Sequence, residues 1–429
     1  GIISGPATNN SVLINWMTTA TANQTVSVSY TNSLGCSNIT NQPVTIHPLP
    51  VATFTTSTPS PVCQDYPTPS LFTVDASGPA STYLWQITPP TLGVMTDPTA
   101  NPLSVTWKLP GTSAQSAQLR VTATTTGAPP LCSLTSLPMT VVINPKPHTQ
   151  LQICFDAVTT QNAKPFVLKG GLPLGSSGVF RIDNLSGSPV TTITPAALSI
   201  GNHTIYYTYT DNNGCIATDS KILRVDASNA GFSCGSLLTD PRDNQVYKTV
   251  LIGGKCWMQE NLRYHTANPA ISHLSPQTDN CVWEKYCLST DPTCSLYGGM
   301  YQWDELMQYT TATKGQGFCP PGWHVPDDAE WAVLINAISS LTPGDGIAGS
   351  YLRDVNATGL FKAGPAGVFY LNSLEAFSGQ AFNASFFWTS TVITAGRAVT
   401  RGLNDVNPSV SFYEGSKADA FPVRCVKDN

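Results

Sequence analysis

The sequence is poor in charged residues and has no excess of basic ones. Only 11% of its 429 residues are Asp, Glu, Lys or Arg, and the formal net charge is −5. A nucleic-acid-binding surface needs clustered Lys and Arg, so this balance excludes one. The sequence also lacks any apolar run of about 18 residues, and we therefore predict no membrane-spanning helix.

Motifs that carry enzyme chemistry are missing as well. No Gly-rich phosphate loop, no Ser/His/Asp order and no inward carboxylate pair stands out. The twelve cysteines include no Cys-x-x-Cys pair, which argues against zinc or thioredoxin-like chemistry. We expect a protein that is not an enzyme and has no cofactor. Cysteines of this number are typical of disulfides, and hence of an extracellular or cell-surface protein.

Composition divides the chain into two parts. Residues 1–233 carry 8 basic and 8 acidic side chains, whereas residues 234–429 carry 13 basic and 18 acidic ones. Six of the nine Trp also lie in the second part. A sparsely charged front part is thus followed by a denser, acidic and aromatic back part.

The front part contains an internal repeat. Gly1–Pro50 matches Gly93–Pro147, with GIISGPATNNSVLINW against GVMTDPTANPLSVTW, VSVSYTNSLGCS against LRVTATTTGAPPLCS, and QPVTIHPLP against LPMTVVINPKP. The second copy has about 30 more residues before Gly93. We therefore expect Gly1 to lie inside a domain of a longer protein. The absence of an export signal at Gly1 agrees with this expectation.

Antiparallel β-sandwiches are indicated by short stretches in which side-chain character alternates from one residue to the next, such as Val26–Tyr30 and Thr204–Tyr209. Gly, Pro and Asn-Gly separate these stretches. The segment TYTDNNGCIATDSKILRV (Thr208–Val225) resembles the PKD-like and Ig-like stalk modules of large Bacteroidota surface proteins. The linkers Pro48–Pro50 and Pro145–Pro147 are short and stiff because proline fixes φ. We expect these modules to form an extended stalk without chemistry of its own.

The back part contains TDPRDNQVYKTVLIGGKCWMQENLRY, EKYCLSTDPTCSLYGGMYQWDELMQY, GQGFCPPGWHVPDDAEWAVL, FFWTST and AFPVRCVKDN in this order. This series resembles the Fibrobacter succinogenes major paralogous domain, and the resemblance implies a C-type-lectin-like fold. The predicted fold class is multidomain and mainly β: tandem Ig/PKD-like β-sandwiches followed by an α+β C-type-lectin-like domain. The predicted domains are a partial PKD-like sandwich (1–50), a PKD-like sandwich (51–146), an Ig-like sandwich (147–226) and the lectin-like domain (234–429).

Helices and strands can be predicted in this last domain. Asp327-x-x-Glu330 has capping-box spacing before an apolar stripe, so a helix of about three turns is expected there. The stripe comprises Trp331, Leu334, Ile335 and Ile338. A shorter helix is expected at Trp303–Tyr309. Strands are expected at Phe386–Ile393, Arg397–Leu403, Ser409–Tyr413 and Phe421–Val426, with Trp388 in the core.

Five disulfides are predicted from position. They are Cys63–Cys132, Cys154–Cys215, Cys256–Cys281, Cys287–Cys294 and Cys319–Cys425. For Cys234, Cys256 and Cys281, three connectivities fit equally well, and our preference leaves Cys234 free or bonded outside the domain. Cys36 is expected to pair with a cysteine preceding Gly1. The Cys319–Cys425 bond is expected to hold the end of the chain to the start of a subdomain.

Candidate ligand-binding residues lie in the long segment Leu360–Phe382, where lectin-like folds place a variable loop. They are Phe369, Tyr370, Glu375 and Phe377. Asn404-Asp405 is the nearest sequence to a lectin Ca²⁺ motif, but turn formation explains it equally well, so Ca²⁺ is the weaker interpretation. Asp211 and Asp219 could also hold Ca²⁺, but turn formation is the better explanation of both residues. A Cys319–His324 reactive pair is disfavoured, because a disulfide removes the thiolate that it would need.

The sequence therefore predicts the stalk and tip region of a secreted or cell-surface protein. The tip is expected to be an adhesin that binds a glycan or a surface protein. The alternative is a structural domain that caps the stalk, contacts other surface subunits or engages export machinery. An enzyme is the third and weakest interpretation.

Overall fold

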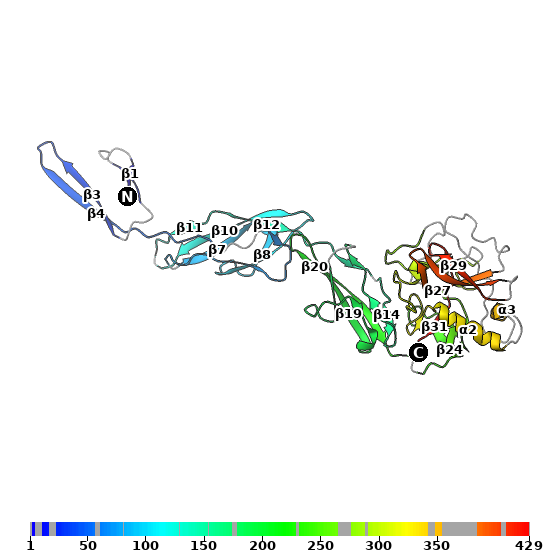
Figure 1. The fold of residues 1–429 in the computed structure, drawn as a ribbon. Helices are drawn as coiled ribbons and strands as arrows, with labels where there is room; N and C mark the ends of the chain where they lie inside the picture. The colour runs from blue at the N-terminus through cyan, green and yellow to red at the C-terminus, as the bar shows by residue number, and fades with distance from the viewer. Residues whose placement is uncertain are drawn as a thin grey trace. The chain divides into compact units, whose positions relative to one another are not determined.

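The computed structural model describes residues 2–4, 11–16, 23–55, 61–79, 81–127, 129–152, 154–173, 178–228, 231–264, 276–287, 291–341, 348–353, 384–404 and 409–428. These residues are mainly β, with few helices and many small sheets (Figure 1). The chain forms two compact units. Unit 1 comprises Gly1–His148 and Tyr209–Ala217, and unit 2 comprises Thr149–Thr208 and Thr218–Asn429.

Unit 1 begins with two hairpins. β1 (Ile2–Ser4) pairs with β2 (Leu13–Asn15), and β3 (Gln24–Thr31) pairs with β4 (Ser37–Val44). Asn32 shapes the β3–β4 turn, because its Oδ1 accepts hydrogen bonds from the backbone N–H groups of Leu34 and Cys36, both at 3.0 Å. Asn is common in such turns for this reason.

Two sheets with a shared core follow in unit 1. One sheet contains β5 (Val62–Cys63), β7 (Ser81–Thr88), β10 (Gln115–Thr125), β11 (Ser133–Thr135) and β12 (Met139–Asn144). The other contains β6 (Ser70–Phe72), β8 (Gly93–Met95), which follows the short helix η1 (Pro90–Leu92), and β9 (Leu103–Trp107). Buried side chains alternate along β9 and β10 and join one apolar cluster. The strand alternation predicted from the sequence is thus confirmed here.

A third module, defined as the described residues of 149–226, has three small sheets. They contain β13 (Gln150–Leu151) with β16 (Gly171–Leu172); β15 (Phe166–Val167) with β18 (Thr192–Ile193); and β14 (Val158–Thr160), β17 (Val179–Ile182), β19 (Gly201–Thr210) and β20 (Ile216–Asp226). The short helix η2 (Pro195–Ala197) precedes β19. Asp211 Oδ1 accepts the backbone N–H groups of Asn213 and Cys215, so Asp211 is a turn residue here. Asp219 Oδ2 accepts the Leu151 N–H and thereby connects β20 to β13.

The remaining described residues, 231–428, are called the terminal domain. Its sheets contain β21 (Leu238–Thr239) with β22 (Val246–Tyr247); β23 (Thr249–Ile252), β24 (Lys255–Met258), β31 (Val426–Lys427) and β26 (Trp323–His324); β25 (Tyr301–Gln302) with β30 (Ala420–Phe421); and β27 (Ala384–Thr394), β28 (Arg397–Asn404) and β29 (Ser411–Ser416). Its helices are α1 (Trp303–Leu306), α2 (Asp328–Leu341) and α3 (Ala348–Arg353). In Figure 1, α2 lies beside β24 and β31. Trp257 of β24 and Trp331 of α2 pack edge to face at 5.3 Å between ring centroids.

The predicted capping box of α2 is confirmed. Asp327 Oδ1 accepts the Glu330 N–H at 2.8 Å, and Glu330 Oε2 accepts the Asp327 N–H at 3.2 Å. Trp331, Leu334 and Ile338 are buried as expected. These reciprocal bonds satisfy donors that a helix start leaves unpaired.

Other elements differ in extent from the prediction. The helix expected at Trp303–Tyr309 is only α1, because Gln308 and Tyr309 have positive φ of 52° and 56° and end it. The strand expected at Phe421–Val426 is divided into β30 and β31. Trp388 is fully buried, as predicted. No helix in the described residues combines the length and hydropathy needed to cross a bilayer.

Candidate ligand-binding site

Of the predicted ligand-binding residues, only Asn404 lies among the residues that the structure describes. Phe369, Tyr370, Glu375, Phe377 and Asp405 lie outside the described residues. Asn404 is the last residue of β28, where it pairs with Ala384. Among the described residues no group of three His, Cys, Asp or Glu could hold a metal ion. The Ca²⁺ interpretation therefore stays a prediction.

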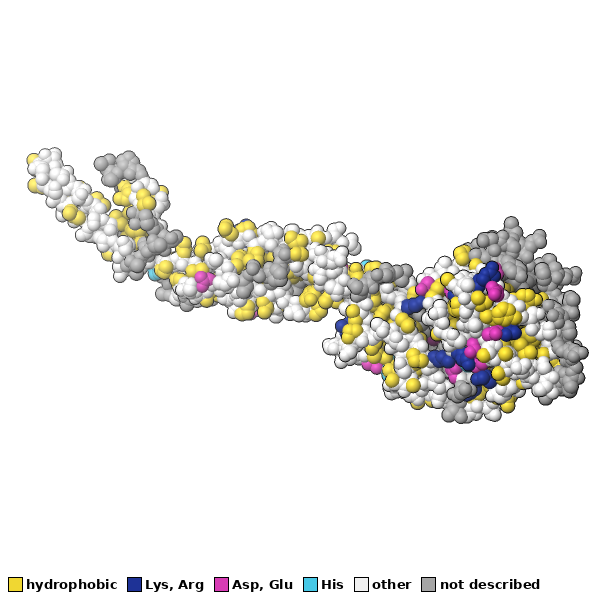
Figure 2. All heavy atoms as spheres, viewed as in Figure 1, with side chains coloured by type: hydrophobic (Ala, Val, Ile, Leu, Met, Phe, Trp, Pro, Cys, Tyr) yellow, Lys and Arg dark blue, Asp and Glu magenta, His cyan; other side chains and the backbone are white. Residues whose placement is uncertain are grey.

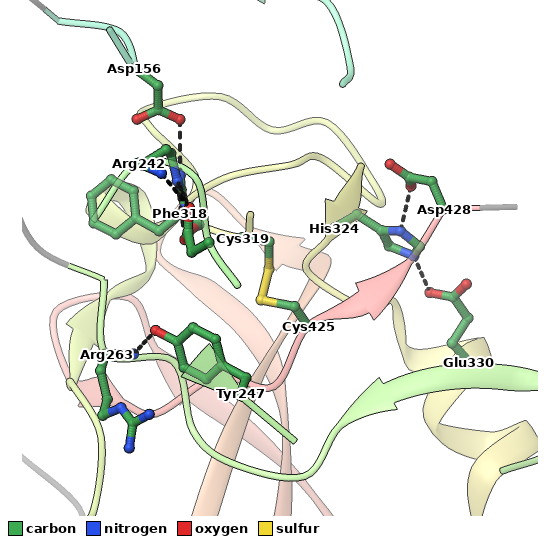
Figure 3. The surroundings of a disulfide bond; sticks show 11 residues. Asp156, Arg242, Tyr247, Arg263, Phe318, Cys319, His324, Glu330, Cys425 and Asp428 are labelled. Carbon is green, nitrogen blue, oxygen red and sulfur yellow. Dashed lines mark hydrogen bonds and ion pairs between the residues drawn. A yellow bond between two sulfur atoms is a disulfide. The ribbon is translucent and has the colours of Figure 1, made fainter. Parts of the chain in front are cut away.

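Two of the five predicted disulfides are present. Cys319 and Cys425 are bonded, with Cα atoms 5.7 Å apart, as are Cys287 and Cys294 at 5.0 Å. The Cys319–Cys425 bond lies inside the larger apolar cluster of the terminal domain (Figure 3). It connects the segment before β26 to the segment before β31, so it fixes two neighbouring strands rather than a ligand site.

The predicted Cys63–Cys132 and Cys154–Cys215 bonds are wrong, because Cys63 bonds to Cys215 and Cys132 is free. Strand register explains the first error. Cys63 on β5 lies beside the part of β12 that pairs with Gln115, whereas Cys132 precedes a strand that pairs with Thr124. Those two positions on β10 are roughly 30 Å apart at the usual rise of a strand. A disulfide spans less than about 7 Å between Cα atoms.

The third error concerns Cys256, which bonds to Cys234 rather than to Cys281. Cys234 is brought near β23 by hydrogen bonds of Thr249 Oγ1, which accepts the Gly235 N–H and donates to the Ser236 carbonyl. Cys281 instead bonds to Cys154 of the third module. Cys36 is exposed and has no disulfide partner among the described residues.

The Cys154–Cys281 bond marks a junction between the third module and the terminal domain. Arg242 lies at its centre, with a side chain only 2% exposed. It donates hydrogen bonds to Asp156 at 2.9 Å and to the Phe318 carbonyl at 2.7 Å (Figure 3). It also donates a hydrogen bond to Asp240 at 2.7 Å. Burial opposes its charge, but Asp156 and Asp240 raise the pKa of Arg242 well above its usual value. Arg242 therefore keeps its positive charge despite its burial.

Tyr264 completes this cluster. Its ring lies 3.6 Å from the Arg242 guanidinium carbon, and its hydroxyl donates to Asp156 Oδ1 at 2.9 Å. Burial, followed by the charge of Asp156, raises the pKa of Tyr264 well above its usual value, so the hydroxyl keeps its proton. Asp156 is thus held by two partners from the terminal domain.

A groove of about 560 Å³ opens beside this cluster, and we call it the junction groove. Its lining joins aromatic, amide and charged side chains from both sides of the junction: Gln150, Leu151, Gln152, Phe155, Ala157, Val158, Lys221, Arg242, Tyr264, Asn280, Cys281, Val282 and Trp283. Gln150 and Asn280 are exposed, whereas Trp283 is half-buried and packs edge to face on Phe318 at 5.1 Å. Ring faces beside amide groups suit a polar ligand that has apolar C–H faces.

Sequence reasoning missed this groove. Gln150 and Trp283 belong to different predicted domains, and neither lies in a recognisable motif. The available signal was the odd number of cysteines among Cys234, Cys256 and Cys281; our preference left Cys234 over, whereas Cys281 is the one that bonds outside its domain. A cysteine left without a local partner indicates a contact with another part of the chain.

A second polar cluster surrounds His324. Its Nδ1 lies 2.7 Å from Asp428 Oδ1, and its Nε2 lies 2.9 Å from Glu330 Oε2 (Figure 3). Lys255 and Lys314 lie 3.1 and 3.4 Å from Glu330 Oε1. Burial opposes its charge, but hydrogen bonds to Asp428 and Glu330 raise the pKa of His324. Burial likewise opposes the Glu330 charge, but His324 lowers the pKa of Glu330 to about 2.

Figure 2 shows Lys, Arg, Asp and Glu side chains gathered on the terminal domain, as its composition predicts. Both ring nitrogens of His324 face carboxylates, and Cys319 is in a disulfide. Cys319 and His324 are therefore structural in this arrangement. Through its contacts with Glu330 and Asp428, His324 connects helix α2 to the last described residues of the chain.

Comparison with known proteins bears on the terminal domain. Residues 250–427 match the family model of the Fibrobacter succinogenes major domain. This match falls within predicted domain 234–429 and confirms the resemblance for that part. No curated protein matches the chain.

Among solved structures, mouse protocadherin-24 EC1-3 is similar at 12% identity over 53% of this chain and 86% of that chain, with a TM-score of 0.22. A Ca²⁺-stabilized adhesin that helps an Antarctic bacterium bind ice is similar at 12% identity, covering 55% and 70%, with a TM-score of 0.20. Drosophila N-cadherin EC1-4 is similar at 11%, covering 59% and 64%, with a TM-score of 0.18. Similarities this low carry no argument about ligand or partner.

Proposed function

We propose that the chain is the stalk and tip region of an extracellular surface protein, and that its tip binds a glycan in the junction groove. The finer identities predicted from the sequence belong to this proposal: PKD-like and Ig-like modules in the stalk, a C-type-lectin-like tip, and the boundaries 1–50, 51–146, 147–226 and 234–429. Five disulfides support an oxidising location, because cytosolic proteins rarely keep them.

One observation carries the binding proposal. The half-buried Trp283 ring and the Gln150, Gln152 and Asn280 amides line one groove of about 560 Å³. Aromatic rings bind the C–H faces of sugars, and amides bind their hydroxyl groups with directional hydrogen bonds. A buried ion pair and a disulfide hold the two sides of the groove together. Such a preorganised groove avoids part of the entropic cost of binding.

A glycan array probed with the whole 429-residue chain tests this proposal. We expect binding to one or more glycans, weakened about tenfold or more by Gln150→Ala and by Trp283→Leu, while Trp283→Phe keeps an aromatic face and most of the binding. Gln86→Ala is the matched control, since Gln86 is an exposed amide on β7 outside the groove. Glycan binding unaffected by all groove variants would contradict the assignment, as would binding of proteins alone.

The structural alternative is supported by the same junction. Arg242, Asp156 and Cys154–Cys281 join the third module to the terminal domain, as expected of a domain that caps a stalk. Deletion of residues 234–429 distinguishes the two. Loss of glycan binding with normal export and assembly supports the tip, whereas failed export or assembly supports the structural role.

A further inference from the structure

A second cavity in unit 2 is lined by three lysines, and we call it the lysine pocket. It has a volume of about 420 Å³, and its cations are Lys164, Lys169 and Lys314. Of the described residues that line it, only Asp156 is acidic, and Arg242 already pairs with that carboxylate at 2.9 Å. The lining therefore has an excess of positive charge, although the whole chain has a net charge of −5.

Ion pairs hold the three ammonium groups without covering them. Their acidic partners are not part of the lining and lie 3.2, 3.3 and 3.4 Å away: Asp428 for Lys164, Asp279 for Lys169, and Asp327 and Glu330 for Lys314. The three lysine side chains are still 34%, 33% and 40% exposed. Because an ammonium group has three N–H donors, each lysine can keep its acidic partner and also donate to a ligand oxygen.

The backbone around the lysine pocket is held in place by hydrogen bonds. Lys314 has a positive φ of 57°, and its N–H donates to Ser390 Oγ of β27 at 2.9 Å. Lys169 Nζ donates to the Gln308 carbonyl at 3.4 Å and thereby connects the two sides of the pocket. Cations that are already positioned lose less conformational entropy when a ligand binds.

Apolar groups lie beside these cations in the same lining. Phe155 and Phe166 stack with 6.0 Å between ring centroids and 22° between ring planes. Phe166 is half-buried and Pro165 is exposed. A ring face next to an ammonium group suits a sugar with an acidic substituent, because the ring contacts the C–H face and the ammonium binds the oxyanion.

An adjoining cavity of about 400 Å³ extends the positive lining. The residues that line both cavities are Lys164, Pro165 and Lys314. The adjoining cavity adds Lys255, whose Nζ lies 3.1 Å from Glu330. Four lysines along two connected cavities favour a ligand with acidic groups on successive units over a single small anion, because contacts made by linked groups reinforce one another.

We propose that the lysine pocket binds an acidic oligosaccharide, whose sugar units carry carboxylate or sulfate groups. These oxyanions contact Lys164, Lys169 and Lys314, and a sugar ring lies on Phe166. The site goes beyond the proposed function, because Phe155 is the only described residue that it shares with the junction groove.

The test measures binding of the whole 429-residue chain to three polysaccharides by isothermal titration calorimetry. Dextran sulfate carries sulfate, polygalacturonate carries carboxylate, and unmodified dextran carries neither. We expect binding to at least one charged polymer and none to dextran, and the charged polymer that binds identifies the oxyanion. Raising NaCl from about 0.05 M to about 0.5 M should weaken this binding tenfold or more, because salt screens exposed charges.

Substitution of single lysines locates the site. Lys164→Gln and Lys169→Gln should each weaken binding by about fivefold or more, since each removes a hydrogen bond between charged groups. Lys169→Arg keeps the charge and should keep most of the binding. Lys248→Gln is the matched control, because it removes the same charge from an exposed lysine of unit 2 outside both cavities.

Four results would overturn the proposal. The first is no binding to either charged polymer, and the second is equal binding to dextran. The third is an equal loss in Lys248→Gln and Lys169→Gln, which would indicate attraction to the surface as a whole. These three leave the junction groove untouched, because Gln150→Ala and Trp283→Leu test that site. The fourth is a loss in Gln150→Ala with none in Lys169→Gln, which would assign the acidic ligand to the junction groove.

Discussion

Arg242 Nη1 lies 2.9 Å from Asp156 Oδ2, and 86 residues separate the two along the chain. Both side chains are buried, at 2% and 7% exposure. The ion pair joins two segments that composition alone assigns to different domains. Because a buried charge without a partner is costly, neither residue can be removed alone without weakening the junction.

Replacing Arg242 with Met should destabilise unit 2 by about 3–5 kcal/mol, since Asp156 and Asp240 would be left buried without their cation. Asp156→Asn should cost less, because the amide still accepts the Tyr264 hydroxyl. Urea unfolding followed by Trp fluorescence measures both. If the double variant loses less stability than the two single variants lose together, the two residues interact directly.

Arg224→Met is the matched control for that experiment. Arg224 pairs with Asp226 at 3.0 Å, but the two side chains are 50% and 37% exposed. Exposed pairs contribute only about 0–1 kcal/mol. Equal effects of Arg242→Met and Arg224→Met would contradict a buried role for Arg242.

The local elements were predictable because their signals are local. Asp327 and Glu330 are three residues apart, and the capping box they predict is present. The same is true of Cys287–Cys294, whose two cysteines are seven positions apart in the sequence. Such features depend on spacing within a few residues, which the sequence contains directly.

The disulfide connectivity and the junction groove were not predictable in this way. Cys63 bonds to Cys215 over 152 positions, and Cys154 bonds to Cys281 over 127. Each bond depends on which distant segments meet in the folded chain, and spacing along the sequence does not contain that information. The groove has the same origin, because Gln150 and Trp283 meet only after the third module packs against the terminal domain.

Non-reducing peptide mapping should find the Cys63–Cys215 and Cys154–Cys281 bonds and free thiols at Cys36 and Cys132. Digestion of the unreduced protein, followed by mass spectrometry, identifies each linked peptide pair. Alkylation before reduction labels the free thiols. A Cys63–Cys132 peptide pair would contradict the register of β5 and β11 described here.

Glu305 should make the protein less stable as pH rises through the neutral range. Its carboxyl is 2% exposed, and burial raises its pKa to about 8 from an unfolded value near 4.5. The folded state therefore holds a proton that the unfolded state has released between these values. Stability should fall across that window with a slope of up to about 1.4 kcal/mol per pH unit.

Glu305→Gln should remove this slope. The Gln carbonyl can still accept the Glu284 N–H, which Glu305 Oε1 accepts at 2.9 Å. The variant should match the wild type in stability below pH 4.5 and exceed it near pH 8. Glu414→Gln, at an exposed position of β29, is the control and should leave the profile unchanged. A variant that is less stable than the wild type at every pH would contradict this prediction.

His324 should produce a pH dependence of the same sign as Glu305 on its alkaline side. Its folded pKa is raised above 6.5, so the stability from its contacts with Asp428 and Glu330 is fully present below pH 6.5 and is lost as pH rises through the folded pKa. The pKa of Glu330 is lowered to about 2, so its contribution is present above pH 4.5 and is lost as pH falls toward 2. The cluster should therefore stabilise the folded state most between pH 4.5 and pH 6.5.

His324→Gln tests this window, since Gln keeps polar atoms but cannot carry the charge. We expect a loss of about 1.5–3 kcal/mol between pH 4.5 and 6.5, the usual size for hydrogen bonds to charged groups. The loss should shrink at alkaline pH, where His324 of the wild type is neutral and the charged contacts are absent from both proteins. His148→Gln, at an exposed position of unit 1, is the matched control. Thermal unfolding across this pH range measures the difference, and a loss that grows with rising pH would contradict the charged state assigned to His324.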